Sequence, residues 1–324
     1  MTMAESVEIR PNALMWLLGS AKTLLFGTLF CMTPVTAVIV LGWLMRRMRW
    51  QAGAEIAARP GWVMGARGSG WLSRLLGGFA ANVREGVLAA FSLFLATIPF
   101  GAIWLLSWWA GWENSFSKGY EQAWVGPVLG LTGVVVFCVT MIWLPMAIVH
   151  QAVVNKALAL FEWRRVRSVV RHTRWNYLMF AVVSVILALP LFGQRSLVVF
   201  ASDLIPGFDN MSLQQVSGIA STVTLLTAGY VFVSLVILRG WSARVYARAV
   251  GRALKGPDAP LWQGIALATP AVGGRSWRLT HWVRAVFLAI IWFGLVTQIF
   301  VGQFMNHDWH LWVTHPFTLL PWAG

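Results

Sequence analysis

Long apolar blocks alternate along this chain with two kinds of connecting segment, one rich in arginine and the other almost free of it. Each block approaches the roughly 20 apolar residues that a helix needs to cross the hydrocarbon core of a bilayer. Charged residues make up only 11% of the 324 residues, whereas a soluble domain carries about 25%. The sequence therefore predicts an all-α, polytopic transmembrane bundle of six spans in three hairpins, over residues 23–44, 86–110, 128–149, 177–192, 218–238 and 283–304.

The connecting segments divide the charge unevenly. The segments after the first, third and fifth blocks hold 21 of the 25 basic residues. Basic residues near span ends stay on the cytoplasmic side of a membrane. We therefore expect these three segments inside and both termini outside, in a bacterial inner membrane, with residues 1–22 as an outer interfacial segment, 23–304 as the membrane domain and 305–324 as an outer aromatic and histidine-containing tail. The formal charge is then +17 on the inner side and −3 on the outer side.

Two stripes of arginine stand out in the inner segments, the first within EWRRVRSVVRHTRW at 162–175. Their three- and four-residue spacing predicts basic amphipathic cytoplasmic helices that lie on an anionic leaflet, where each cation gains about 1 kcal/mol from acidic lipid. Nucleic-acid binding is excluded as an interpretation, because no DNA- or RNA-binding module accompanies the charge. The predicted lipid headgroup ligands are Arg164, Arg167, Arg171 and Arg174 in the first stripe and Arg244, Arg248 and Arg252 in the second.

Aromatic and glycine patterns mark candidate packing surfaces. Trp104, Trp108 and Trp112 repeat every four residues and share one face at the outer end of the second block. This face could pack against a partner subunit, a pigment or a sterol-like lipid, or it could belong to the interfacial tryptophan belt of a membrane protein. Gly126 and Gly130 form a GxxxG motif, which lets helices approach closely.

Metal and thiol chemistry have weak candidates. His307, Asp308 and His310 in the outer tail could collect a metal ion, although solvated interfacial side chains are the simpler interpretation, because no fourth ligand is evident. Cys31 and Cys138 lie inside apolar blocks and are expected to be buried free thiols. No cofactor is identified by these residues.

Two prolines raise local questions about the blocks that contain them. Pro145 should kink the third block near its inner end, and a neighbouring helix or water must then satisfy the freed carbonyl. Pro190 comes at the end of the fourth apolar run. Residues 197–208 either continue that span or lie at the membrane interface.

The apolar stretches of the blocks lack the ionisable groups that ion-coupled transporters need at depth. No hydrolase, zinc-protease or nucleotide-binding motif occurs either. We therefore expect a protein without catalysis of its own, an accessory or scaffold subunit of a larger membrane complex. Two alternatives stay open: a lipid or small-solute permease component, and a pigment- or quinone-contacting subunit of a photosynthetic or respiratory complex.

One stretch resembles a known family. Residues 145–178 contain Pro145-Met146-Ala147, Ala159, Phe161, Trp163, Val166, Val170 and Tyr177-Leu178. These features resemble an uncharacterised family of polytopic prokaryotic membrane proteins that is similar to the membrane domain of some glycerophosphodiester phosphodiesterases. The resemblance implies a span, a cytoplasmic amphipathic helix and a return span, and it carries no activity.

Reporter fusions test the predicted layout. A fluorescent protein that folds only in the cytoplasm should stay dark when it is fused after Gly324, and alkaline phosphatase should be active there, because the C-terminus is expected outside. The same fusions after Lys255, in the third basic segment, are the control and should give the opposite pattern. Fluorescence at Gly324 would overturn the layout.

Overall fold

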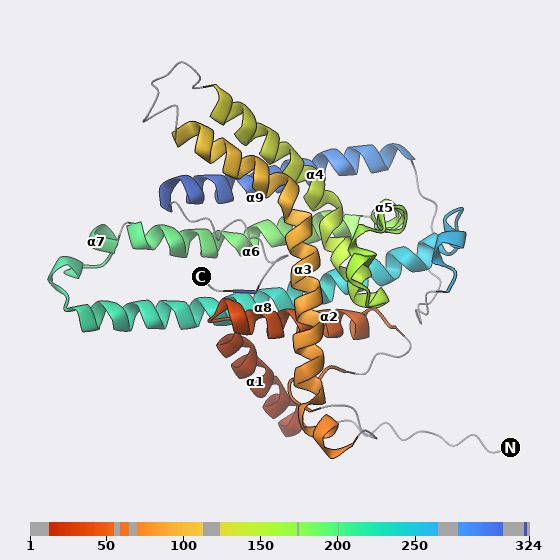
Figure 1. Ribbon diagram of the computed structural model, residues 1–324, viewed down its shortest axis with the longest axis horizontal. Coiled ribbons are helices and arrows are strands. Elements are labelled where there is room, and N and C mark those ends of the chain that lie inside the picture. Colours follow the sequence, from red (N-terminus) through yellow and green to blue (C-terminus); the bar gives the residue numbers. More distant parts are fainter. Residues whose placement is uncertain are drawn as a thin grey trace.

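The computed structural model describes residues 13–54, 59–64, 70–112, 124–173, 175–199, 201–264, 278–306 and 321–322. In this part of the chain the all-α prediction is confirmed, and Figure 1 shows α6 and α8 side by side with the α3–α4 pair crossing their direction. The elements are α1 (Ala13–Phe30), α2 (Pro34–Gln51), α3 (Trp71–Trp112), α4 (Val125–Val154), η2 (Ala157–Phe161), α5 (Trp163–His172), α6 (Trp175–Val199), α7 (Ala201–Leu204), η3 (Phe208–Asn210), α8 (Leu213–Ala253), η4 (Ala259–Trp262) and α9 (Arg278–Asn306).

Among the described residues, three helices are by themselves long and apolar enough to cross a membrane, and they contain the predicted second, third and fifth spans. Of these, α3 has 42 residues and α8 has 41. At 1.5 Å per residue each is about 60 Å long, roughly twice the hydrocarbon core. Both carry their arginines in the part that exceeds the predicted span, so the excess length lies at the basic end. Helices α6 and α9 cover the predicted fourth and sixth spans, but neither is by itself long and apolar enough among the described residues to cross a membrane.

The predicted first span is wrong as a single helix. Helix α1 ends at Phe30 and α2 begins at Pro34, and the two helices meet in a V (Figure 1). Thr33 caps α2, since its hydroxyl accepts a hydrogen bond from the Thr36 amide at 3.3 Å. Proline suits the first helical position but has no N–H with which to continue a preceding helix. The Thr33-Pro34 pair is the sequence signal for this break, and apolar length alone conceals it.

Pro145 lies inside α4, where it removes the hydrogen bond that the Met141 carbonyl would otherwise accept. Tyr177 of α6 donates its hydroxyl to the Ile142 carbonyl at 3.0 Å and lies 3.5 Å from that of Met141. A neighbouring helix therefore supplies a donor at this site, one of the two sources predicted, with its shorter bond to the carbonyl next to the freed one. Tyr177 is completely buried, so its hydroxyl ties α6 to α4 in the protein interior.

Helix α6 continues through Pro190 to Val199, so this helix is longer than the apolar run predicts. Residues 201–210 then form two short turns, α7 and η3, rather than a further length of α6. Tyr230 of α8 donates to the Leu187 carbonyl at 2.9 Å, one residue beyond the carbonyl that Pro190 leaves without its usual donor. At both prolines a tyrosine from a neighbouring helix therefore donates near the freed carbonyl, and at Pro190 its bond goes to the adjacent one.

Helices α2 and α3 cross with their backbones in contact. A Cβ atom added at Gly42 would overlap the Asn82 carbonyl, and one added at Gly86 would overlap that of Val38. Close backbone approach of this kind is the use that membrane helices make of small residues. It brings α2 against α3 at the level where both helices begin to carry charged side chains.

Replacing Tyr177 by Phe should destabilise the protein by about 1–3 kcal/mol, the cost of leaving a buried carbonyl without a donor. The same change should cost less in a Pro145→Ala background, where an ordinary helical amide reaches the Met141 carbonyl. The measurement is the free energy of unfolding of the four proteins in mild detergent. An equal cost in both backgrounds would show that the tyrosine does not serve the proline site.

Candidate functional site at the basic end of the bundle

Helix ends that are far apart in the sequence meet at one end of the molecule. The C-terminal parts of α2, α4 and α8 converge there with η2, α5 and η4 (Figure 1). This is the end that the distribution of basic residues predicts to be cytoplasmic. Among the residues that the structure describes, the acidic side chains of this end, Glu85, Glu162 and Asp258, each pair with an arginine or a histidine.

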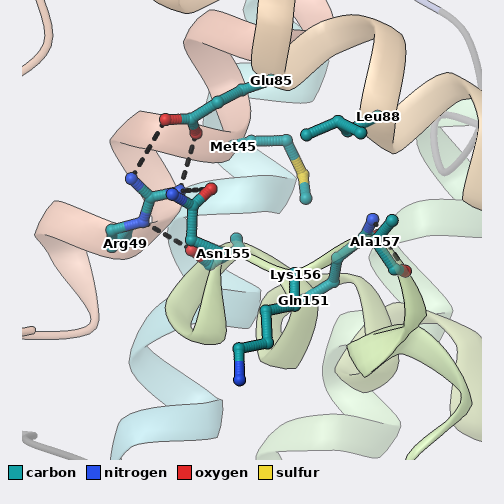
Figure 2. A pocket seen from close by; sticks show the side chains of 9 residues that line it. Met45, Arg49, Glu85, Leu88, Gln151, Asn155, Lys156 and Ala157 are labelled. Atoms are coloured by element: carbon teal, nitrogen blue, oxygen red, sulfur yellow. Dashed lines mark hydrogen bonds and ion pairs between the residues drawn. The ribbon is translucent and has the colours of Figure 1, made fainter.

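Arg49 is the centre of the first polar cluster (Figure 2). Its guanidinium binds both carboxyl oxygens of Glu85, at 3.1 and 2.7 Å. It also donates to the Ala152 carbonyl at 2.6 Å and to Asn155 Oδ1 at 2.7 Å. Asn155 caps α4 in the left-handed conformation, at φ 58°, which asparagine tolerates better than most residues. One side chain therefore joins α2, α3 and the end of α4.

Arg46, one turn before Arg49, holds a connecting segment in place. It donates to Asn82 Oδ1 at 2.8 Å and to the Gly78 carbonyl at 3.1 Å. The Asn82 amide in turn donates to the carbonyls of Gly61 and Trp62, at 3.2 and 3.1 Å. Since Asn82 is fully buried, these bonds satisfy it and fix residues 59–64 against α2 and α3.

His150 is the centre of the second polar cluster, and it is completely buried. Its Nδ1 lies 2.8 Å from the Tyr246 hydroxyl, and its Nε2 lies 3.0 Å from Glu162 Oε2. Arg165 donates to the same carboxyl oxygen at 2.7 Å. The cluster joins α4, α5 and α8, and Trp262 packs edge-on against the imidazole with ring centres 5.7 Å apart.

The environment of Glu162 favours the ionised carboxylate. Partial burial works to raise its pKa, but the hydrogen bonds from His150 and Arg165 and their charges outweigh this effect. The pKa of Glu162 therefore lies below its usual range. The carboxylate acts as the shared acceptor between α4 and α5 across the neutral pH range.

Two arginines cap the C-terminus of α5. Arg284 of α9 donates to the carbonyls of Val170 and Arg171, at 3.0 and 3.1 Å. Arg252 of α8 donates to the carbonyl of His172. The last carbonyls of a helix lack partners within it and carry partial negative charge, so guanidinium donors stabilise them. These contacts fix α5, which meets α6 at 97°.

A short segment after α8 packs onto the same helix. Asp258 accepts a hydrogen bond from the Ser168 hydroxyl at 2.7 Å, and the Trp262 indole donates to that hydroxyl at 3.3 Å. Arg165 donates to the Leu261 carbonyl at 2.9 Å. Helix α5 is therefore held by α4, α8, α9 and η4 together, as a fixed part of the fold.

The predicted lipid ligands divide into two groups. The side chains of Arg164, Arg167, Arg171, Arg244 and Arg248 are exposed, so both stripes reach the surface, but Arg252 turns inward to α5. Arg174 lies outside the described residues. The apolar side of α5 differs from expectation, because Val166 and Val169 are buried in protein. The helix therefore presents its arginines, rather than its valines, to its surroundings.

The predicted packing residues lie mostly between α3 and α4. Trp104 is 2% exposed and stacks on Phe137, and a Cβ at Gly133 would overlap its indole. Gly126 and Gly130 are buried, and Ser107 donates to the Gly126 carbonyl at 2.6 Å. Trp108 is 50% exposed, and of Trp112 the structure describes only the backbone. The tryptophan stripe thus serves the chain's own hairpin at Trp104 and reaches the surface at Trp108.

The remaining sequence candidates have simple outcomes. His307, Asp308 and His310 lie outside the described residues, and within those residues no three His, Cys, Asp or Glu side chains gather as a metal site. Cys31 and Cys138 are buried free thiols, as predicted. Sequence reasoning identified His150 as a polar residue at the end of the third block, and it missed Glu85, Asn82 and Tyr246. Their position at the edges of apolar blocks was the available signal.

No protein-family model, curated protein or solved structure shows significant similarity to this chain. The resemblance of residues 145–178 to a family of prokaryotic membrane proteins stays a prediction.

The pKa of Glu162 gives a pH-dependent prediction. Because that pKa is lower in the folded than in the unfolded protein, Glu162 contributes stability above its unfolded value of about 4.3 and loses it as the pH falls through the lower folded value. Glu162→Gln should therefore lower the unfolding temperature at neutral pH, and the difference from the wild type should shrink in acid. Thermal unfolding in detergent at several pH values measures this, and a deficit that is the same at every pH would contradict it.

Proposed function

We propose that the protein is an accessory or scaffold subunit of a larger membrane assembly in the bacterial inner membrane, without catalysis of its own. The observation that carries the proposal is the change in exposure along the outer half of α3. Trp104 is buried against α4, but Leu105, Leu106, Trp108 and Trp109 are each at least 50% exposed. Tryptophan is prominent among the residues that dominate binding at protein interfaces. A pair of exposed tryptophans beside a rigid packed hairpin suits a docking face for another subunit.

The packing of that hairpin supports a rigid role. Phe100, Trp104 and Phe137 form a triangle of rings with centres 5.2 to 5.6 Å apart, between α3 and α4. Aromatic pairs at such distances add about 0.5–1.5 kcal/mol beyond their burial. A membrane pair held in this way offers a fixed surface, as a scaffold needs.

We infer that the basic end faces the cytoplasm, from the positive-inside rule. The pairs α3–α4 and α6–α8 then form two hairpins with their connections outside, and α9 returns the chain to the outer side. In this proposal the V-shaped α1–α2 pair takes the place of the first passage in the six-span layout expected from the sequence.

The exposed arginines give the inner side a second proposed role, contact with anionic lipid. Because α5 is fixed by contacts on several sides, the side chains of Arg164, Arg167 and Arg171 form a preorganised stripe that loses little order on binding. Arg244 and Arg248 extend the basic surface along α8. An anionic leaflet attracts such side chains within a Debye length.

A lipid or small-solute permease component is the second candidate. The buried contact between His150 and Tyr246 favours it, because ionisable groups inside membrane helices often mark a pathway. The contact lies at the inner ends of α4 and α8, where it also has the structural role described above. For this reason the scaffold is the better supported function.

Native mass spectrometry of gently solubilised membranes tests the proposal. The wild-type chain should appear in a stable complex with another membrane protein. Replacing Trp108 and Trp109 by Ala should lower the recovered partner about tenfold or more, the loss expected for interface residues of this kind. Trp71→Ala, an exposed tryptophan at the other end of the same helix, is the matched control and should leave recovery unchanged.

The opposite result would favour the permease. A chain that runs alone, is indifferent to the Trp108 and Trp109 changes and catalyses uptake into liposomes would overturn the scaffold proposal. An absorption spectrum of the same preparation tests the third alternative, since a bound pigment or quinone absorbs where the polypeptide does not.

A further inference from the structure

A small pocket lies where α2, α3 and the end of α4 meet, beside the pair formed by Arg49 and Glu85 (Figure 2). The room inside it is about 10 Å³, enough for one hydroxyl group or water molecule, and it opens to the surface. Met45 and Leu88 supply its apolar wall, and the polar lining comes from Gln151, Asn155 and Lys156 together with the ion pair. None of the roles described so far requires a pocket at this place.

The position of the pocket in the chain corresponds to the headgroup level of a membrane. Met45 directly follows the first apolar block, Leu88 is at the start of the second, and Gln151 is the second residue after the third. Three ends of predicted spans therefore meet around one cavity. A lipid headgroup, or a soluble molecule of the same chemistry, would reach it from the inner side.

Gln151 is the most informative residue of the lining. It is only 3% exposed, and its Nε2 donates to the Ser92 hydroxyl at 2.8 Å and to the Ala157 carbonyl at 3.3 Å. A carbonyl can only accept, so this contact fixes which end of the amide is nitrogen. The other end, Oε1, is buried without a hydrogen-bond donor among the described residues. A buried acceptor in this state favours a ligand that brings an O–H or N–H group.

The charges of the lining favour an anion. Arg49 and Glu85 compensate each other in a two-point ion pair. Lys156 is exposed at the rim, so the lining carries one positive charge in excess. In Figure 2 its side chain extends outward from the other lining residues, where its flexible stem lets the ammonium meet a phosphate at the mouth. The amide nitrogen of Asn155 is a second donor beside it.

We propose that this pocket binds a hydroxyl-bearing phosphodiester, whose hydroxyl donates to Gln151 Oε1 and whose phosphate contacts Lys156 and Asn155. The phosphoglycerol headgroup of an anionic phospholipid has this chemistry, and so does a free glycerophosphodiester. The site goes beyond the scaffold function and is distinct from the arginine stripe of α5. The arginine stripe attracts a ligand by charge alone, whereas the pocket also accepts a hydrogen bond from a hydroxyl group of the ligand.

The test compares two lipids that differ only in the headgroup hydroxyls, phosphatidylglycerol and phosphatidylpropanol. Delipidated full-length protein is titrated with each lipid in detergent, and the bound lipid is counted by native mass spectrometry. The wild type should retain phosphatidylglycerol about fivefold more strongly, the ratio that one added hydrogen bond supplies. Gln151→Met, which keeps the length of the side chain and loses the acceptor together with the amide donor, should bring the ratio close to one.

Two further variants keep the test decisive if Gln151→Met does not fold. Lys156→Gln should weaken binding of both lipids at this site about fivefold, as loss of a charge-assisted contact would. Lys255→Gln removes the same charge from an exposed position at the same end and should have no effect. The triple change of Arg164, Arg167 and Arg171 to Gln should lower retention of both lipids without altering the ratio.

A wild-type ratio near one, or a ratio that Gln151→Met leaves unchanged, would overturn the proposal, and either result could occur whether or not a partner subunit is found. Competition by soluble glycerophosphoglycerol assigns the source of the ligand. Displacement of bound phosphatidylglycerol supports a free phosphodiester as the ligand, and failure of displacement supports the lipid headgroup.

Discussion

The ion pair between Arg49 and Glu85 is the interaction on which the arrangement of the basic end depends. Helices in a membrane gain little from burying apolar side chains against each other, because lipid is equally apolar. Polar contacts and close backbone approach must therefore position them. Gly42 and Gly86 let α2 and α3 approach until their backbones touch, and Arg49 then reaches Glu85 and the end of α4 in one fork of bonds. The second cluster, around His150, repeats this arrangement between α4, α5 and α8. Together the two clusters hold the ends of these long helices in fixed positions relative to one another.

Backbone carbonyls impose the second constraint, and side chains from other helices satisfy it. Each proline inside α4 and α6 frees a carbonyl, and a tyrosine from a neighbouring helix donates at or beside that place. The C-terminus of α5 receives Arg252 and Arg284 in the same manner. An unsatisfied carbonyl costs several kcal/mol in a medium without water, so these donors determine which helices must be neighbours. The three described tyrosines all bond across helices, which is economical for a chain with only four.

Local pattern in the sequence predicts the helices well and their mutual contacts poorly. Apolar length locates α3, α4 and α8, and arginine spacing locates α5 with its exposed face. The need for a donor beside Pro145 also follows from local chemistry, although its identity as Tyr177 does not. The pairings that build the site join residues 36 apart, as in Arg49 and Glu85, or 96 apart, as in His150 and Tyr246, and no local periodicity encodes them. Arg252 illustrates the difference, because its spacing places it on the same stripe as Arg244 and Arg248, yet the packing of α5 against α8 turns it inward. The helix break before Pro34 also has a local signal, the capping residue Thr33. It was not predicted because the apolar run is continuous across it.

The arginines of the basic end therefore belong to two populations with different physical roles. The first population comprises Arg46, Arg49, Arg252 and Arg284. Their guanidinium groups donate hydrogen bonds to carbonyls and carboxylates of the protein itself, so the fold needs them whatever lipid surrounds it. Arg164, Arg167, Arg244 and Arg248 are exposed, and repulsion among like charges on a fixed surface costs stability unless something negative lies opposite. Contacts within the chain account for the first population, whereas the second has few of them, such as the bond from Arg244 to the Gly240 carbonyl. The exposed stripe is thus the part of this positive charge that points to a role outside the chain, and the anionic leaflet proposed as its partner would supply the opposite sign.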